Sequence, residues 1–495
     1  MRVWSSMFGL GLLCLLTLGL AAGPAFAENA AGGEESWQSI YISGQRVGFA
    51  HVQIRDVERE GRSLTVSDTL SQMTIRRFGI SLKMSVQQTT EEDADGNLLS
   101  YRFSVINPPL SKTESRGEIV DGQLQLTTLN SGIEKTSTAP WDAAVKSPAW
   151  IERVLEIEPL EAGQSRTFKM FDPQFTKVAE MTLTHRGEEE TELLDGSRAL
   201  LEKIESRHSL VPGLVLTSYV DSKGETRKSV TNLMDMTTFT VTKEEALKEI
   251  SPGDLDIGMD TVIKTGPIPN VHKAERGVYV VTTDGPAAGI LPEGATQSVT
   301  QTGDRSLELT VRAIRPGDAG EEPAPGPEYL AASRFLDTDD PVVRELANEG
   351  AGAETDPAKL AVKLEKFVHA KVKDKNFSTA LATASEVARE LSGDCTEHAV
   401  LLAAALRVRD VPSRVVIGFV YADSIGGFGG HMWTEAYING TWVPLDATLG
   451  LGGIGVGHIK VTDADLAENS AAPVGAFVPI IHLLGKTQIK PGVVE

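Results

Sequence analysis

The stretch GDCTEHAVLLAAALR, residues 393–407, holds one of the two cysteines in a chain of 495 residues. Asp394 has the position of a helix N-cap before Cys395, and Glu397 follows at the spacing of a capping box. The residues after it are almost wholly apolar, which predicts a buried helix that begins at Cys395. Because the N-terminus of a helix carries partial positive charge, this position favours the reactive thiolate form of cysteine.

The other cysteine, Cys14, lies in an N-terminal segment that has the pattern of a secretory signal peptide. One positive charge at Arg2 precedes an apolar stretch of about 13 residues, and the sequence AFA, typical of a cleavage site, ends at residue 27. Such a stretch is short for a membrane span, although an uncleaved anchor is the alternative. We therefore expect residues 1–27 to be a signal peptide and the mature chain to be exported, periplasmic or extracellular, with one cysteine.

The composition limits the classes of partner. The formal net charge is −21, and an acidic chain without a basic stripe argues against nucleic acid and against anionic membrane surfaces. After residue 27 no stretch reaches 18 apolar residues, so we expect no transmembrane segment in the mature chain. The sequence contains neither a calcium-binding loop nor a nucleotide motif, and we expect no metal and no cofactor. It indicates no oligomeric state.

Residues 28–250 have the pattern of a β-rich region. Alternating stretches such as RSLTVSDTLSQMTI recur between turn signals, two of which are Asp-Gly pairs ending at Gly96 and Gly122. Short strands at this spacing predict a large antiparallel sheet, a sandwich or a half-barrel, with a single helix near residues 148–157. No cluster in this region looks catalytic. Its scattered histidines, for which we expect structural roles, are His51, His185 and His208.

Two further segments follow the β-rich region. Residues 251–325 combine a boundary rich in glycine and proline with a smaller β segment, and the stretch RPGDAGEEPAPGPE has the composition of a linker or long loop. Residues 326–495 change to an α+β pattern in which helices precede strands. Helices are predicted to open at Pro341, at Pro357 and near residue 385, before the helix of the opening stretch. Strands are predicted from Ser413 onward.

A thiolate nucleophile needs a group that moves its proton, and His431 has the position to do so. HMWTEAYINGTWVPLDAT, which starts at His431, contains the strong hairpin signal Asn439-Gly440. Counting outward from a two-residue loop places His431 and Asp446 on one face as diagonal neighbours, roughly 7–8 Å apart at the backbone. A carboxylate at that separation can reach the imidazole. The spacing therefore predicts a triad of Cys395, His431 and Asp446.

Other interpretations compete with this triad. His398 is on the same helix as Cys395, but its side chain should lean back along the helix, and no acid is placed to orient it. A metal site of Cys395, His398 and His431 lacks a fourth soft ligand and the spacing of zinc sites. A lone cysteine could also be a small buried hydrophobic residue, or it could form a disulfide between two chains.

These motifs resemble the transglutaminase-like superfamily, and most closely its exported bacterial members. The match runs from about residue 329 to the end, on GDCTEHAVLLAAALR, VPSRVVIGFVY, GGHMWTEAYINGTWVPLDAT and GHIKV. The resemblance implies a papain-like core with Cys395 as nucleophile, His431 as acid and base, and Asp446 as the orienting acid. Two positions depart from the family pattern, because Asp410 replaces a common glycine and Ala447 replaces a common proline.

The resemblance also implies a reaction. The backbone N–H of Cys395 is a natural oxyanion donor, and a side-chain donor could come from Asn376. The chemistry is acyl transfer on protein or peptide amides through a thioester on Cys395. The alternatives are a cysteine peptidase or amidase on the same core, and a catalytically silent binding or scaffold protein. For the β-rich region we expect either recognition of a macromolecular substrate or a purely structural base.

Overall fold

The computed structural model describes residues 27–28, 33–59, 61–77, 80–107, 111–130, 133–250, 256–373, 382–467 and 473–495. The predicted signal peptide lies outside the described residues except for Ala27, and Asn376 also lies outside them. The described residues fall into two compact units, an N-terminal unit up to residue 250 and a C-terminal unit from Asp256 onward. Among the described residues, no helix is long and apolar enough to span a membrane.

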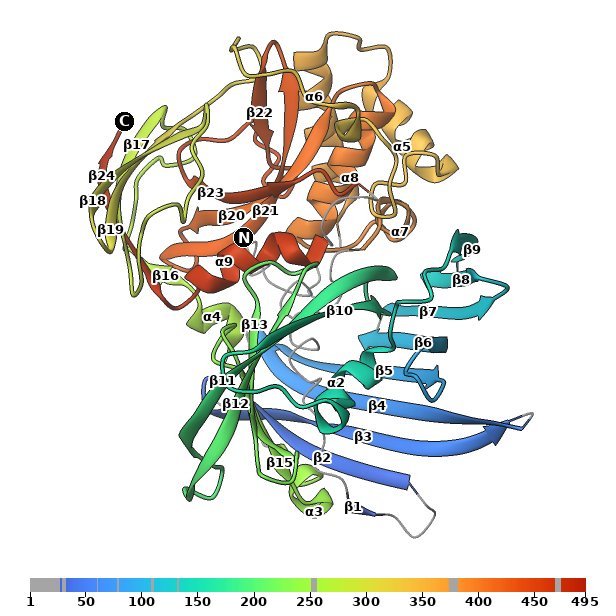
Figure 1. Cartoon of the computed structure of the whole chain (residues 1–495). Helices are drawn as coiled ribbons and strands as arrows, with labels where there is room; N and C mark the ends of the chain where they lie inside the picture. The colour runs from blue at the N-terminus through green and yellow to red at the C-terminus, as the bar shows by residue number, and fades with distance from the viewer. Residues whose placement is uncertain are drawn as a thin grey trace. The chain divides into compact units, whose positions relative to one another are not determined.

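The N-terminal unit is built on one 15-stranded antiparallel sheet. Its strand order is β10-β11-β12-β13-β14-β15-β2-β3-β4-β5-β6-β7-β8-β9, with β1 paired to β2. Figure 1 shows the sheet bent around one helix, α2 (Pro148–Ile157), which contacts β5 and β10. The strands are β1 (Ala27–Glu28), β2 (Gly33–Ile42), β3 (Gln45–Arg59), β4 (Arg62–Arg77), β5 (Ile80–Glu92), β6 (Leu98–Asn107), β7 (Ser111–Val120), β8 (Gln123–Asn130), β9 (Ile133–Pro140), β10 (Ser165–Asp172), β11 (Lys177–Glu192), β12 (Arg198–His208), β13 (Val215–Val220), β14 (Thr226–Thr231) and β15 (Thr237–Val241).

The predicted large antiparallel sheet is thus confirmed, and the helix lies over the predicted residues. The turn signal at Asp121-Gly122 closes β7 and β8 with Val120 opposite Gln123, and both turn residues have positive φ. The strands are longer than the predicted spacing, because β4 and β11 each run for 16 residues. Alternating polar and apolar side chains continue through such strands, since one face of the sheet packs inward and the other meets water. Helix α3 (Lys243–Ala246) ends the unit.

The C-terminal unit places one buried helix at its centre. Helix α8 (Cys395–Val408) contacts three other helices and strands β20 and β21 of a five-stranded sheet. The predicted helix starts are confirmed, because Asp340 and Asp356 cap helices whose first residues are Pro341 and Pro357. The helices are α4 (Ile257–Asp260), η1 (Pro327–Tyr329), α5 (Pro341–Ala351), α6 (Pro357–Lys371), α7 (Ala384–Glu390), η2 (Pro473–Phe477) and α9 (Val478–Leu483). The sheet consists of β16 (Ile263–Lys264), β20 (Ser413–Ala422), β21 (Gly427–Ile438), β22 (Thr441–Leu445) and β23 (His458–Ala464).

A second, four-stranded sheet has the order β18-β19-β17-β24. Three of its strands come from the smaller β segment, namely β17 (Arg276–Thr283), β18 (Gln297–Gly303) and β19 (Ser306–Arg312). The fourth, β24 (Thr487–Val494), comes from the end of the chain and pairs antiparallel with β17. Backbone pairing therefore joins residues 251–325 to residues 326–495, which the composition of the sequence had divided.

The stretch predicted as a linker or long loop is held against the hairpin of β21 and β22. The backbone N–H groups of Gly320 and Glu322 donate to the carbonyls of Asn439 and Gly440, at 3.0 and 2.8 Å. The Glu322 carboxylate accepts from the hydroxyl of Thr441 at 2.6 Å. A segment rich in glycine and proline is therefore fixed in place, because its backbone groups find partners on the hairpin loop.

Candidate active site

Cys395 is the first residue of α8, and the N-terminus of that helix has the predicted capping box. The Asp394 carboxylate accepts from Thr396 N at 2.9 Å, and the Glu397 carboxylate accepts from Asp394 N at 2.9 Å. Cys395 is 1% exposed. The thiol is thus fixed in the first turn of a buried helix, at the end that carries partial positive charge.

Glu397 supports this helix start as a buried acid. Burial, together with the charge of Asp394, raises the pKa of Glu397 to about 8. The carboxyl bends back to reach Asp394 N, and that path needs glycine at position 393. A Cβ on Gly393, whose φ is +139°, would lie 2.4 Å from Glu397 Cγ. Gly393, Asp394 and Glu397 together therefore fix the start of the helix at Cys395.

The hairpin of β21 and β22 has the predicted register. Ile438 faces Thr441 across the loop, and the ladder continues to the pair Thr434 and Leu445. Asn439 and Gly440 have φ values of 50° and 78°, as a two-residue hairpin loop requires. One step beyond the ladder, His431 Nε2 lies 2.7 Å from Asp446 Oδ2, and both side chains are buried. His431 and Asp446, which the turn predicts to be diagonal neighbours, therefore form a direct hydrogen bond.

Asp446 is held as a carboxylate by four hydrogen bonds. Its Oδ1 accepts from the backbone N–H groups of Thr448 and Leu449, at 2.8 and 3.3 Å. Its Oδ2 accepts from the rings of His431 and His458. Burial alone raises the pKa of Asp446, but the charges and hydrogen bonds of the two histidines outweigh it and hold the pKa well below its usual range. Asp446 therefore stays negative beside the imidazoles.

The hydrogen bond to Asp446 also assigns the two nitrogens of His431. Because a carboxylate can only accept, Nε2 carries the donated proton and Nδ1 of the neutral ring presents a lone pair. Nδ1 is buried and has no hydrogen-bond partner among the residues that the structure describes. Strand β21 itself is fixed to α8, since the Thr434 hydroxyl donates to the carbonyl of Ala399 at 2.9 Å. The helix of Cys395 and the strand of His431 thus pack directly on each other.

Comparison with known proteins shows which family these elements resemble. The family model of the transglutaminase-like superfamily matches residues 344–447, a span that contains Cys395, His431 and Asp446. Residues 344–447 therefore belong to a transglutaminase-like domain. The match covers helix α8 and the β21–β22 hairpin, the same elements on which the sequence motifs lie.

Solved structures give weaker likenesses. A candidate cysteine protease from Cytophaga hutchinsonii is 15% identical, with 45% of this chain and 85% of that chain covered and a TM-score of 0.29. A β-barrel-like protein of a domain of unknown function from Brucella abortus is 12% identical, with coverage of 42% and 93% and a TM-score of 0.28. The periplasmic domain of TgpA from Pseudomonas aeruginosa, bound to ethylmercury, is 15% identical, with coverage of 39% and 93% and a TM-score of 0.27. No curated protein matches the chain.

His458, the first residue of β23, is a site residue that the sequence did not single out. Its Nε2 lies 3.0 Å from Asp446 Oδ2, and its ring packs edge-on to Trp433 at a centroid distance of 5.2 Å. Burial lowers the pKa of His458 to about 4, so the ring is neutral near pH 7 and donates through Nε2–H. It lies in GHIKV, one of the stretches on which the resemblance rests. Asp446 is thus oriented by two imidazoles.

Replacing His458 by leucine is expected to lower kcat/KM about tenfold, because one hydrogen bond to the Asp446 carboxylate is lost. Glutamine can place an N–H group where the ring has Nε2, so His458→Gln should recover most of the activity. Steady-state rates of the two variants measure this. Equal losses in both would show that His458 only fills space.

Glu365 is a second residue that the sequence did not single out. It lies on α6, is 0% exposed, and its Oε1 accepts from the backbone N–H groups of Asp446 and Gly453, at 3.3 and 3.4 Å. Burial, with the nearby charge of Asp446, raises the pKa of Glu365 to about 8. A glutamate inside the apolar stripe of the predicted helix, next to Leu364, was the signal that could have identified it. Glu365 holds the backbone of Asp446 in place as a protonated acid.

The raised pKa of Glu365 makes stability depend on pH with a defined sign. Between the ordinary glutamate pKa and about 8 the folded chain binds a proton that the unfolded chain has lost, so the free energy of unfolding falls as pH rises. Glu365→Gln removes this loss. Relative to the unaltered protein, the variant should gain roughly 1–3 kcal/mol between pH 5 and pH 8.

Urea unfolding at four pH values measures that gain. The matched control is Glu349→Gln, because Glu349 is a half-exposed residue paired with Lys371 at 2.7 Å on the surface. The control should show no such trend. If the stability of Glu365→Gln relative to the unaltered protein fell or stayed constant as pH rises, the assignment of Glu365 as a protonated acid would be wrong.

The structure also bears on the two competing interpretations, His398 as the base and a metal site. His398 Nδ1 donates to the carbonyl of Asp394 at 2.6 Å, so this ring leans back along its own helix as predicted. The ring nitrogens of His431 and His458 and an oxygen of Asp446 lie within 4.8 Å of one another, a donor set that suits a divalent cation. Tetrahedral ligands at roughly 2 Å from zinc are about 3.3 Å apart. The separations of 2.7 and 3.0 Å fit hydrogen bonds better than ligands of one ion.

Proposed function

We propose that this chain is an exported cysteine enzyme that performs acyl transfer on protein or peptide amides through a thioester on Cys395. The observation that carries the proposal is the buried contact of 2.7 Å between His431 and Asp446. His431 is on strand β21, which packs against the helix that begins with Cys395. The transglutaminase-like family of residues 344–447 supports a cysteine enzyme. The signal-peptide pattern of residues 1–27 supports export.

Helices followed by a sheet, with the cysteine at the start of the central helix, support a papain-like core for this domain. In that arrangement the three residues act in sequence. Cys395 is the nucleophile, His431 moves protons, and Asp446 orients the ring of His431 and stabilises it when it becomes positive. Asp446 itself stays ionised throughout, because four hydrogen bonds favour its carboxylate.

In the first half-reaction, His431 Nδ1 takes the thiol proton and Cys395 Sγ attacks the carbonyl carbon of an amide. The tetrahedral oxyanion forms near the backbone N–H of Cys395, one of the N–H groups that an α-helix leaves without an intrahelical partner at its N-terminus. The C–N bond then breaks, and the leaving amine takes the proton from the imidazolium. A thioester on Cys395 and a free amine or ammonia result.

In the second half-reaction, an acceptor attacks the thioester after giving its proton to His431. The Cys395 thiolate leaves and regains that proton. A primary amine yields a new amide, and this is the transfer reaction that we propose. Water yields a carboxylic acid, and the same site then acts as a peptidase or amidase. Because Cys395 is 1% exposed, entry of the acyl donor requires the side chains that cover the thiol to move.

The β-rich unit carries no part of this chemistry in our proposal. It recognises or positions the macromolecular substrate, since binding energy remote from the reacting bond can orient that bond. A scaffold without catalysis is the alternative for the whole chain. The buried contact of His431 with the ionised Asp446 disfavours it, because a buried carboxylate is expensive to keep without a use.

Product analysis tests the proposal. The mature protein is incubated with casein in the presence and absence of a fluorescent primary amine, and the products are resolved by mass spectrometry. Amine incorporated into casein with release of ammonia supports transfer. Hydrolysed amide bonds in both samples would replace transfer with the peptidase or amidase function. A protein that neither incorporates amine nor hydrolyses casein would contradict a role as an acyl-transferring enzyme on protein amides.

A further inference from the structure

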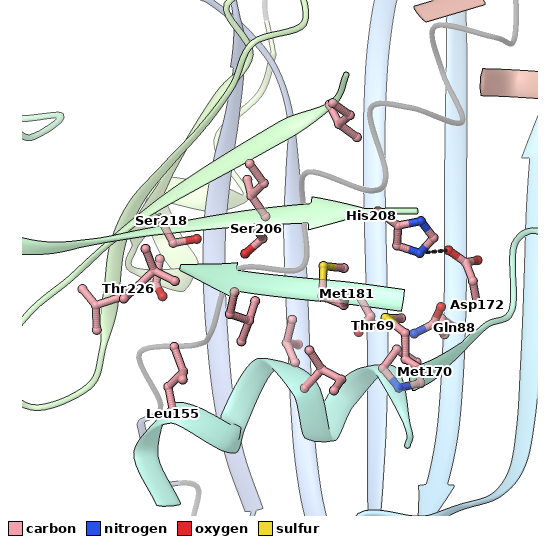
Figure 2. Close-up of a pocket in the computed structure, with 18 of the residues that line it drawn as sticks. Thr69, Gln88, Leu155, Met170, Asp172, Met181, Ser206, His208, Ser218 and Thr226 are labelled. Carbon is pink, nitrogen blue, oxygen red and sulfur yellow. Dashed lines mark ion pairs between the residues drawn. The ribbon is translucent and has the colours of Figure 1, made fainter. Parts of the chain in front are cut away.

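A cavity lies inside the curved sheet of the N-terminal unit (Figure 2). Strands β3 to β6 line one side, strands β10 to β14 line the other, and α2 contributes Ile151 and Leu155. Its volume is about 220 Å³. An engineered cavity of about 150 Å³ with aliphatic walls stays dry and binds benzene. The space in this unit can therefore hold a larger apolar group.

The walls of this cavity are dominated by aliphatic, aromatic and thioether side chains. Among them are Val52, Phe103, Ile151, Met181, Leu183 and Ile204. Several of these also belong to the apolar core between α2 and strands β10 and β11. Hydrocarbon placed there leaves water without forfeiting hydrogen bonds, and each buried methylene strengthens binding by about fourfold.

One end of the cavity carries a buried polar pair. Asp172 and His208 are 4% and 6% exposed, and Figure 2 shows the ring facing the carboxylate. Asp172 Oδ1 accepts from the backbone N–H groups of Gln174 and Phe175, at 2.8 and 3.2 Å. His208 Nδ1 accepts from Leu210 N at 3.2 Å, so the ring is neutral and its proton is on Nε2.

The Nε2–H group of His208 is not satisfied within the described part of the chain. It lies 3.2 Å from Asp172 Oδ2, which is ion-pair distance, yet it has no hydrogen bond of acceptable geometry to any described residue. The donor is therefore misaligned with the carboxylate, and hydrogen bonds weaken steeply when misaligned. A buried donor of this kind costs free energy unless something accepts from it.

We propose that the N-terminal unit binds a neutral acyl lipid in this cavity. The hydrocarbon chain lies among the apolar walls, and the ester or amide carbonyl accepts a hydrogen bond from His208 Nε2–H. The headgroup is neutral because the Asp172 carboxylate, beside the donor, would repel an anionic one. This binding site is separate from the acyl-transfer site, and it does not depend on the proposed function.

The experiment uses the delipidated mature chain at pH 8 and the fluorescent apolar probe 1-N-phenylnaphthylamine. Displacement of the probe is titrated with 1-monolaurin, which is neutral, and with laurate, which has the same chain and a negative charge. Monolaurin is expected to displace the probe at a concentration at least tenfold lower than laurate. Equal or tighter binding of laurate would overturn the neutral headgroup. No binding of probe or lipid would overturn the site.

Two tryptophan variants test whether the ligand occupies the cavity. Ile204→Trp fills the cavity and should abolish displacement, whereas Leu200→Trp, on the same strand and 62% exposed, should leave it unchanged. Equal behaviour of the two tryptophan variants would overturn the cavity as the site. Binding should be the same in Cys395→Ala, so a failure of the proposed function leaves this result unaffected.

Two substitutions of His208 separate its two nitrogens. Asparagine can still accept from Leu210 N but loses the Nε2 donor, while glutamine can supply that donor. We expect His208→Asn to weaken monolaurin binding about tenfold and His208→Gln to stay within about threefold of the unaltered protein. Both should bind the hydrocarbon probe equally. If monolaurin binds equally to both variants, the carbonyl contact is wrong.

Discussion

Cys395→Ala is expected to abolish turnover, lowering kcat/KM by roughly 10⁴- to 10⁶-fold while the chain stays folded. The substitution removes the atom that forms the thioester, and no other described side chain supplies a thiol. Alanine fits the first turn of α8, and the capping contacts of Asp394 and Glu397 do not involve the sulfur. Amine incorporation or hydrolysis of casein, with a thermal melt of the same sample, measures both halves of the expectation.

Cys395→Ser provides the matched comparison, because it keeps a hydroxyl at the same place. It should be nearly as inactive as alanine, since a serine hydroxyl beside a base placed for a thiol is a much weaker nucleophile. More than a tenth of the activity left in Cys395→Ala would show that the chemistry lies elsewhere.

His431→Ala is expected to have an effect of similar size, because it removes the group that takes and returns the proton in both half-reactions. Asp446→Ala should leave more residual activity than either, since Asp446 acts through the ring of His431. Residues that act as a unit are not additive, so the double variant Cys395→Ala/His431→Ala should be no slower than either single variant. The rates of the four variants in one assay measure this.

His398→Ala is the control for the base. This histidine is as buried as His431 and is close in the sequence to Cys395, but its Nδ1 donates to the carbonyl of Asp394. We expect its removal to lower stability rather than the rate per folded molecule. Inactivation by His398→Ala together with a silent His431→Ala would reverse the assignment of the base.

Local signals in the sequence predict much of the C-terminal unit. Pro341 and Pro357 follow aspartates that cap their helices, and the Asn439-Gly440 loop sets the register of β21 and β22. Each of these features depends on residues within a few positions of one another. For that reason the contact between His431 and Asp446 could be counted out from the turn.

The rest depends on partners that are distant in the sequence. Glu365 approaches Asp446 from a helix 81 positions earlier. His458 meets the same carboxylate from a strand that pairs with β20, not with the hairpin. The joining of β24 to β17 and the pair of His208 with Asp172 likewise bring remote segments together. No local pattern encodes these contacts, because they follow from how sheets close and helices pack.

The thioester on Cys395 is the central claim, and trapping it is the most direct test. The mature protein is mixed with a small activated acyl ester, quenched in acid after seconds, and measured by intact mass followed by peptide mapping. The account predicts that the mass increases by one acyl group and that this group is on the peptide that contains Cys395. The Cys395→Ala variant should show no such increase, and the His431→Ala variant should show only a trace of it. Turnover without any adduct on Cys395, or an acyl group carried on a different residue, would contradict it.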